Sequence, residues 1–343
     1  MCAVQHIPYN GARSDNRQNL SMEKFLVTGA GGFVGAALCE ALSERGTPSV
    51  AAMRKSVPER FLGSDIFEIG DLTQDVDWTP ALAGCSVVVH LAARVHMMRE
   101  QAANPESAYR ATNVDATLQL AEQASALGIR RFVFVSSVKV NGEKTESHPF
   151  RADDVPAPQD AYGRSKLAAE EGLRAWAART GTELVIVRPP LVYGPGVRAN
   201  FLRLMQLVKS GVPLPLGSIA NRRSMVALDN LVDFLLLCAT HPAAAGVTWM
   251  VSDNHDLSTP ELVTMMAKAM GRPARLLPVP VSLLATGAGL LGGRAAAGRM
   301  LDSLQVDVSA ALEQLGWKPR LDVPAAIRLA VAPLIASPFP AKA

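Results

Sequence analysis

Apolar and polar positions follow two alternating patterns along the first half of the chain. Short, continuous runs of apolar residues predict strands that are buried on both faces: FLVTGA, PSVAAMR, SVVVHLAA, RRFVFVSS and ELVIVRP. Longer runs rich in alanine and leucine lie between them and predict helices: GAALCEALSERG, NVDATLQLAEQASALG and residues 161–180. This order of strands and helices predicts an α/β fold with a doubly wound parallel sheet.

The pattern changes after Pro189, where proline and glycine become frequent and short strands mix with helices. We predict a dinucleotide-binding domain from residues 22–190 and 224–245, and a smaller mixed α/β substrate lobe from residues 191–223 and 246–335. Residues 1–21 are polar and are predicted to form a disordered extension. The apolar segment at 279–293 is too short to span a membrane and predicts a buried or interfacial helix.

Composition excludes several classes of function. The 343 residues are 49% hydrophobic, enough for a sizeable core, and the net charge is +3. A charge this small implies neither nucleic acid nor an anionic membrane surface as a partner, and we expect no nucleic-acid partner. Four separated cysteines and the lack of a secretory signal predict a cytoplasmic protein with buried thiols. Six scattered histidines show no ligand spacing, so we expect no metal site.

A glycine-rich turn follows the first predicted strand. VTGAGGFVG places Gly29, Gly32 and Gly35 between this strand and the first helix. Glycine permits a tight turn and close approach of a phosphate, and the helix N-terminus adds positive potential. The spacing G-x-x-G-x-x-G differs from the more usual G-x-G-x-x-G. A strand-to-helix turn without any ligand is the alternative interpretation.

The ends of the second and third strands carry candidate contacts for an adenosine. No carboxylate ends the second strand; Arg54 stands there and would pair with a 2′-phosphate, which favours NADP over NAD. Stacking on adenine or plain exposure to solvent are the alternatives for Arg54. In GDLT, Asp71 is a candidate acceptor for the adenine amino group and Leu72 a candidate wall for the ring. An ordinary turn aspartate is the alternative.

Three residues together indicate proton transfer. Ser136 and Ser137 end a buried strand, where ligands bind in parallel sheets. Tyr162 and Lys166 are four residues apart in a predicted helix and therefore share one face. A free phenol has a pKa near ~10 and is a poor base at neutral pH, but a neighbouring ammonium lowers that pKa. We therefore predict Ser137, Tyr162 and Lys166 as a set that interconverts a carbinol and a ketone, with Tyr162 as the base.

The motifs TGAGGFVG, HLAA, VSSVKVNG, YGRSK, RPPLVYGPG and DVSAALEQLGWKP together resemble the extended short-chain dehydrogenases/reductases, whose fold is Rossmann-like. Within this family the chain is most similar to nucleotide-sugar epimerases, dehydratases and 4-keto-sugar reductases. The resemblance implies a UDP-sugar substrate, a homodimer through helices near 105–127 and 162–180, and Asn113 on a helix beneath the sheet. The predicted cofactor contacts are Gly29, Gly32, Phe33, Val34, Gly35, Arg54, Asp71, Leu72, Leu91, Ala92, Ala93, Asn113, Ser136, Tyr162, Lys166 and Pro189.

Several reactions remain open at this point. Family dehydratases carry an Asp-Glu pair where this chain has Val138 and Lys139, which argues against a dehydratase. Our first choice is a 4-keto-sugar reductase of surface-polysaccharide synthesis. A UDP-glucose or UDP-N-acetylglucosamine 4-epimerase is the alternative, and a reductase of a non-nucleotide ketone or a non-catalytic cofactor sensor come after it.

The nucleotide end of the substrate has three candidate contacts. NRRSMVALDN resembles the family segment in which an arginine grips the diphosphate, and this implies Arg223. Asn200 and Arg299 are further candidates for the same end of the substrate. The match is partial, because Ala227, Asn230 and Leu191 replace residues that the family pattern usually carries at these positions.

Overall fold

The computed structural model describes residues 23–55, 61, 63–72, 75–95, 104–290, 298 and 300–336, so the predicted extension 1–21 lies outside the described residues. The chain folds as two compact units. The first contains the chain up to Ser136, Asp160–Val187 and Phe234–Thr248. The second contains Ser137–Gln159, Arg188–Asp233 and the chain from Trp249 onward.

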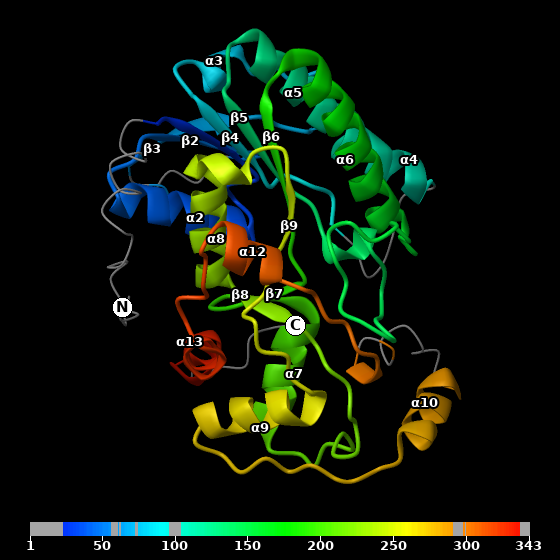
Figure 1. The fold of residues 1–343 in the computed structure, drawn as a ribbon. Helices are drawn as coiled ribbons and strands as arrows, with labels where there is room; N and C mark the ends of the chain where they lie inside the picture. Colours follow the sequence, from blue (N-terminus) through cyan, green and yellow to red (C-terminus); the bar gives the residue numbers. More distant parts are fainter. Residues whose placement is uncertain are drawn as a thin grey trace. The chain divides into compact units, whose positions relative to one another are not determined.

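The first unit is built on a seven-stranded sheet with the strand order β3-β2-β1-β4-β5-β6-β9 (Figure 1). Neighbouring strands from β3 to β6 are parallel, as the continuous apolar runs predict. The strand order reverses between β1 and β4, and ligands of doubly wound sheets bind at the carboxyl ends on either side of such a switch point. The strands are β1 Phe25–Thr28, β2 Ser49–Met53, β3 Ser64–Glu68, β4 Val87–His90, β5 Arg131–Val135, β6 Glu183–Arg188 and β9 Thr248–Met250.

Helices cover both faces of this sheet, which confirms the predicted fold class (Figure 1). The helix predicted at 161–180 is α6, Ala161–Thr180; the Asp160 side chain caps its first turn, and Gly181 ends it with φ 75°. Leu120 of α5 and Trp176 of α6 belong to one buried cluster with strand residues such as Phe132. The other helical segments of this unit are α2 Phe33–Glu44, α3 Thr79–Leu82, α4 Pro105–Arg110, the π-helical turn η2 Ala111–Asp115, α5 Ala116–Ala126 and η4 Pro242–Ala244.

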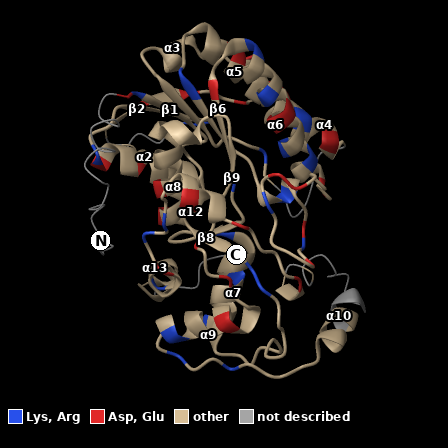
Figure 2. Ribbon diagram, viewed as in Figure 1, with Lys and Arg blue, Asp and Glu red and all other residues tan. Residues whose placement is uncertain are grey.

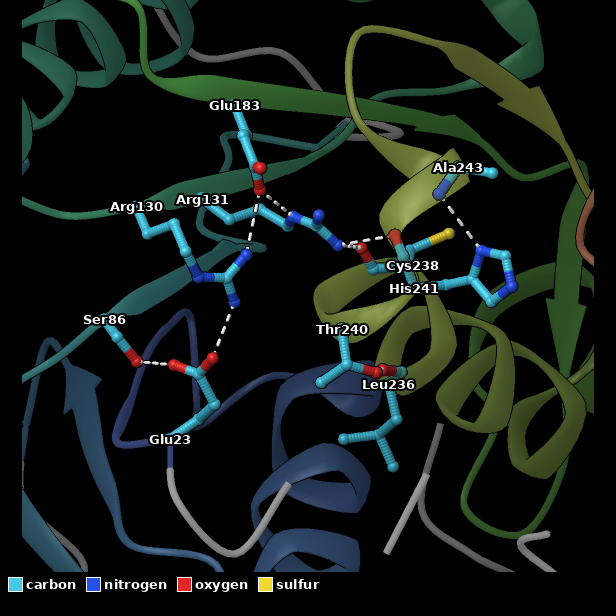
Figure 3. A network of polar contacts seen from close by, with 10 residues as sticks. All are labelled: Glu23, Ser86, Arg130, Arg131, Glu183, Leu236, Cys238, Thr240, His241 and Ala243. Carbon is cyan, nitrogen blue, oxygen red and sulfur yellow. Dashed lines mark hydrogen bonds and ion pairs between the residues drawn. The ribbon is translucent and has the colours of Figure 1, made fainter. Parts of the chain in front are cut away.

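Charged side chains at the amino ends of the strands are paired with one another (Figure 3). Arg130 and Arg131 at the start of β5 both contact Glu183 at the start of β6, at 2.8 and 2.7 Å. Arg131 is buried and also donates to the carbonyl oxygens of Cys238 and His241, at the end of α8 (Leu228–Thr240). These contacts tie β5, β6 and α8 together at this edge of the sheet, opposite the edge where its ligands are expected.

The second unit contains the two-stranded parallel sheet of β7 (Leu191–Tyr193) and β8 (Met225–Ala227). Residues 137–159 belong to this unit, whereas the sequence pattern assigns them to the dinucleotide-binding domain. The pairing of Phe150 with Val306 and the contact of Val138 with Leu304 and Val306 explain this difference. The helical segments of this unit are η3 Val138–Val140, α7 Ala199–Ser210, α9 Thr259–Ala269, α10 Val281–Leu290, α12 Ser309–Gln314 and α13 Val323–Ala336, with the first turns of α8.

The described residues contain neither a membrane-spanning helix nor a cluster of metal-binding side chains. None of their helices is both long and apolar enough to cross a lipid bilayer. The same residues contain no group of three or more histidine, cysteine, aspartate or glutamate side chains placed to hold a metal ion.

Candidate active site

The glycine turn between β1 and α2 requires glycine at two positions. Gly29 has φ 68°, and a Cβ atom on it would lie 2.7 Å from the backbone nitrogen of Ala92, just after β4. A Cβ atom on Gly35 would clash with the carbonyl oxygen of Gly29. The turn is therefore packed directly against the end of β4, at the switch point of the sheet.

The N-terminus of α2 offers backbone groups to a ligand. Gly32 caps this helix with extended backbone, and no acidic side chain lies in the first turn. Gly31 and Gly32 are exposed, whereas Phe33 and Val34 are half-buried. The backbone N–H groups at the start of a helix and the positive end of its dipole suit a diphosphate. The cradle therefore fits the dinucleotide that the sequence predicts.

The predicted adenosine contacts lie at the same edge of the sheet. Arg54 directly follows β2 and is exposed. Asp71 and Leu72 follow β3, the neighbouring strand; Asp71 is exposed and Leu72 is buried. The position of Arg54 suits either role predicted for it, so a preference for NADP stays a prediction.

A chain of hydrogen bonds links β1, β4 and the helix that carries Asn113. The Thr117 hydroxyl donates its proton to the carbonyl oxygen of Asn113, and it therefore accepts a hydrogen bond from Nε2 of His90 (2.9 Å). Because Nε2 of His90 carries the proton, Nδ1 accepts from the Thr28 hydroxyl (2.7 Å). The Thr28 hydroxyl also accepts from the backbone of Leu91 and Ala92. Burial and the charge of Lys166 lower the pKa of His90 to about 3, so this histidine is neutral and holds the predicted cofactor wall in place.

Lys166 is fixed beneath the carboxyl end of β5. Its Nζ atom donates to the carbonyl oxygen of Val135 (2.8 Å) and lies 4.5 Å from the centre of the Phe134 ring. The side chain is buried, and this burial lowers the pKa of Lys166 to about 7, although the carboxylate of Glu170 opposes the shift. The amine therefore titrates in the neutral range, where a small change in its surroundings alters its charge.

Ser136, which directly follows β5, has a partner that the sequence did not reveal. The Ser136 hydroxyl is buried and donates to Oε1 of Glu170 (2.6 Å), one turn beyond Lys166 on α6. Arg174 lies 3.4 Å from the other oxygen of Glu170. Two consecutive turns of α6 are thus anchored to the end of β5. A cofactor contact for Ser136 remains a prediction.

Tyr162 stands near the start of α6, with its ring held by a second tyrosine. The rings of Tyr162 and Tyr109 meet edge to face with centroids 6.3 Å apart, and the Tyr109 hydroxyl donates to the carbonyl oxygen of Val95. The Arg94 guanidinium lies over the Tyr109 ring at 5.5 Å. Tyr109 and Arg94 were missed by sequence reasoning, because no local motif shows that α4 packs beside α6.

Asn113 connects the segment after β4 to α6. Its side chain accepts from the backbone nitrogen of Arg94 (2.7 Å) and donates to the Arg94 carbonyl and to the Ser165 hydroxyl (2.9 Å). Ser165 in turn donates to the carbonyl oxygen of Tyr162 (2.8 Å). These bonds give Asn113 a positioning role in the first unit, where the glycine turn, Leu91–Ala93, Asn113, Tyr162 and Lys166 gather near the ends of β1, β4 and β5.

The remaining predicted residues lie in the second unit. Ser137 caps η3, and its hydroxyl accepts from the backbone nitrogen of Lys139. The carbonyl oxygen of Pro189 accepts from the nitrogen of Val138 at 3.0 Å. Lys139, at the position of a dehydratase carboxylate, pairs instead with Glu143 at 2.7 Å.

The predicted nucleotide contacts differ in how firmly they are held. The half-buried Arg223 donates from Nη1 to the carbonyl oxygen of Asp302 (2.9 Å), and its backbone pairs with Leu257. Asn200 is exposed in the first turn of α7. Arg299 lies outside the described residues. Of the three, only Arg223 is shown with a partner that orients its guanidinium.

Two of the positions that depart from the family pattern, Ala227 and Asn230, make buried polar contacts. Asp253 accepts from the backbone nitrogen of Ala227, from the Asn230 amide and from the Tyr193 hydroxyl. Burial raises the pKa of Asp253, and these hydrogen bonds oppose that shift. The Asn230 carbonyl oxygen accepts from the backbone of Arg320 and Leu321. Asn230 is therefore a structural residue here.

A groove of about 570 Å³ lies elsewhere in the first unit. It is lined by residues 181–184 after α6, by Ala245, Gly246 and Val247, and by Arg174. This groove lies beside the amino end of β6, whereas Lys166 contacts the carboxyl end of β5. We therefore place the candidate site at the carboxyl edge of the sheet.

Comparison with known proteins places the chain in a family. The profile of the NAD dependent epimerase/dehydratase family matches residues 25–251. A UDP-glucose 4-epimerase of Vibrio cholerae is 44% identical over 302 residues, covering 87% of this chain and 91% of that protein. An Escherichia coli O157:H7 protein, N-acetyl-alpha-D-glucosaminyl-diphospho-ditrans,octacis-undecaprenol 4-epimerase, is 30% identical over 272 residues, covering 76% and 77%.

Solved structures share the fold. The UDP-glucuronic acid 4-epimerase of Bacillus cereus in complex with NAD superposes with a TM-score of 0.72 at 22% identity, covering 89% of this chain and 94% of that one. The fold and the sequence comparisons therefore agree with the motifs. The chain belongs to the NAD dependent epimerase/dehydratase family, and it is an enzyme of the extended short-chain dehydrogenase/reductase type.

Proposed function

We propose that the protein inverts carbon 4 of a UDP-hexose with a nicotinamide dinucleotide that it retains through the cycle. The observation that carries this proposal is the intact pair of Tyr162 and Lys166, in a chain 44% identical to a UDP-glucose 4-epimerase over most of both lengths. Our first choice from the motifs, a 4-keto-sugar reductase, remains the competing prediction. Reduction of a non-nucleotide ketone and cofactor sensing remain alternatives after it.

Each residue of the predicted set has a defined task. When bound, the dinucleotide accepts and returns a hydride at the sugar carbon. The glycine turn and the first turn of α2 bind its diphosphate through backbone N–H groups. Tyr162 takes the proton of the 4-hydroxyl group, the ammonium of Lys166 lowers the pKa of that phenol, and Ser137 hydrogen-bonds the reacting oxygen. Asn113 and Tyr109 hold Tyr162 in position.

The fate of the cofactor distinguishes the competing reactions. We expect purified protein, without added dinucleotide, to convert UDP-glucose or UDP-N-acetylglucosamine into its 4-epimer, and to release NAD on denaturation. Product is measured by anion-exchange chromatography, and the released dinucleotide by enzymatic assay. Consumption of one NADPH per 4-keto sugar would establish the reductase and agree with the NADP preference assigned to Arg54. Turnover of non-nucleotide ketones alone, or no turnover, would refute both sugar-nucleotide proposals.

The substrate diphosphate is the proposed ligand of Arg223, with Asn200 and Arg299 as further candidates. We expect Arg223→Gln to raise KM for the UDP-sugar by about ten- to a hundredfold, because a charge-assisted hydrogen bond is lost. Binding of UDP alone, measured by calorimetry, weakens in parallel, whereas retained NAD does not change. Arg222→Gln is the matched control, because Arg222 is exposed and pairs with Glu261. Equal effects of the two substitutions would contradict this role for Arg223.

A second candidate substrate is a hexosamine on a polyprenyl diphosphate. The E. coli relative is named for such a substrate, and this substrate presents the same diphospho-hexose to Tyr162 and Arg223.

We also propose a homodimer through α4, α5 and α6, the helices that the family resemblance implicates.

A further inference from the structure

Helix α10 of the second unit is apolar, and most of its described side chains, in residues 281–286, are exposed. Its ten residues, VSLLATGAGL, include no charged side chain. Leu283 is 64% exposed and Val281 39%, and Leu277 in the segment before the helix is 49% exposed. A helix this apolar, with no charged residue, is normally buried, because leaving it in water forgoes the burial of its apolar surface. The exposure of α10 therefore indicates a partner that covers it.

The charged residues next to α10 in the sequence are all basic. From Leu262 to Leu301 the sequence contains five basic residues and no aspartate or glutamate. Three of these basic residues are described and exposed: Lys268 at the end of α9, and Arg272 and Arg275 in the loop that leads to α10. Figure 2 shows basic segments along this loop and at α9, which also carries the acidic Glu261 in its first turn, and no charge on the described part of α10. The small net charge of the whole chain conceals this local excess.

We propose that α10 and the loop before it dock the second unit onto the surface of an anionic phospholipid bilayer. Apolar side chains of α10 enter the boundary between headgroups and acyl chains, while Arg272 and Arg275 contact lipid phosphates. The apolar segment 279–293 is bounded by Arg294 and is too short to cross a hydrocarbon core of about 30 Å, so we place it on the membrane and not across it. The sequence predicts a buried or interfacial helix at 279–293. This proposal takes the interfacial alternative and names an anionic bilayer as the partner.

The charge pattern favours a bilayer over a second copy of the chain. A twofold interface is self-complementary, so a dimer through α10 would bring the same basic loop of two copies together, and the segment 262–301 has no acidic residue of its own to offset them. An anionic membrane instead offers apolar and negatively charged groups side by side, which is the combination that this surface requires. The proposal does not depend on which sugar the enzyme converts. Docking to a membrane would, however, place a polyprenyl-linked substrate within reach of the enzyme.

Flotation of the full-length protein with vesicles tests the proposal. We expect binding to vesicles of phosphatidylcholine and phosphatidylglycerol (7:3) that is strong at low salt, weakens at high salt, and is at least about tenfold weaker with phosphatidylcholine alone. Leu283→Asp should reduce partitioning to the mixed vesicles by at least about tenfold. The double substitution Arg272→Glu, Arg275→Glu should reduce it similarly and remove most of the salt dependence.

Val155→Asp is the matched control, because Val155 is 87% exposed in the same unit but lies outside the basic segment. It should bind vesicles like the wild type, and all variants should retain the wild-type melting temperature. If Leu283→Asp fails to fold, Leu283→Ser provides the same comparison. The proposal is overturned if the wild type does not float, if Leu283→Asp floats equally well, or if light scattering shows that Leu283→Asp dissociates an oligomer covering α10.

Discussion

Replacement of Tyr162 by phenylalanine should lower kcat for carbon-4 inversion by about 10²–10⁴-fold, because the substitution removes only the oxygen that takes and returns the substrate proton. The aromatic ring remains, so its edge-to-face contact with Tyr109 is retained. Retained dinucleotide should change by less than about twofold, since the glycine turn and the first turn of α2 supply the proposed diphosphate contacts. Both quantities are measured on the same preparation, by chromatography of the sugar nucleotides and by assay of the released cofactor.

Tyr109→Phe provides the control for Tyr162→Phe. It removes a phenolic oxygen from the partner ring, one that donates to the backbone of Val95. This substitution should lower activity only because the Tyr109 ring, and with it the Tyr162 ring that it contacts, is held less firmly. We therefore expect kcat to fall by less than about tenfold. If Tyr162→Phe kept more than a tenth of wild-type turnover, or if Tyr109→Phe lost as much as Tyr162→Phe, the phenol of Tyr162 would not be the base.

Patterns in the sequence predicted the frame of the first unit well. Continuous apolar runs identified strands such as β4 and β5, because a sheet covered on both faces leaves few polar positions in its central strands. The helix at 161–180 was predicted with its observed bounds, and its start and end have local causes in Asp160 and Gly181. Local signals of this kind can be read without knowing which segments meet in space.

The supports of the candidate site depend on contacts between distant segments. Ser136 and Glu170 are 34 residues apart, and Asn113 and Ser165 are 52 apart. Neither pair has a spacing that distinguishes it from other polar residues on helices and strand ends. The buried cluster at Asp253 is of the same kind, since it joins β7, β8 and α8. For this reason the sequence indicated which residues carry chemistry, but it did not indicate which residues hold them in place.

The boundary between the two units shows the same limit. The segment 137–159 follows β5 directly and carries Ser137, so its place in the chain suggested the dinucleotide-binding domain. In the structure it pairs with residues near 303–307, through bonds such as those from Thr145 to Ser303 and from Phe150 to Gln305. No hydrophobic period reveals pairing across more than 150 residues.

Replacement of Lys166 by methionine should lower kcat, because the ammonium assists catalysis, and should also change how the free energy of unfolding depends on pH, because the buried ammonium is unfavourable in the folded state. Burial lowers the pKa of Lys166 to about 7 from an ordinary value of 10.5, so the fold disfavours the charge. The same charge lowers the pKa of the Tyr162 phenol in our proposal. Loss of the ammonium should therefore reduce kcat by at least about 10²-fold near neutral pH, and move the activity that remains toward higher pH, where the phenol loses its proton unaided.

Because the pKa of Lys166 is lowered in the folded protein, its titration makes the folded state more stable as the pH rises. Between pH 7 and 10.5 the unfolded chain holds a proton on this lysine that the folded chain has released, so the free energy of unfolding rises with pH across this window. In Lys166→Met that rise should disappear, and urea denaturation at several pH values measures the difference between the two proteins. Lys209→Met is the matched control, because its ammonium also donates to a backbone carbonyl, that of Leu334, from a partly exposed position. If the pH dependence of Lys166→Met matched that of the wild type, the ammonium would not be held in the dry site described here, and its effect on Tyr162 would lose its physical basis.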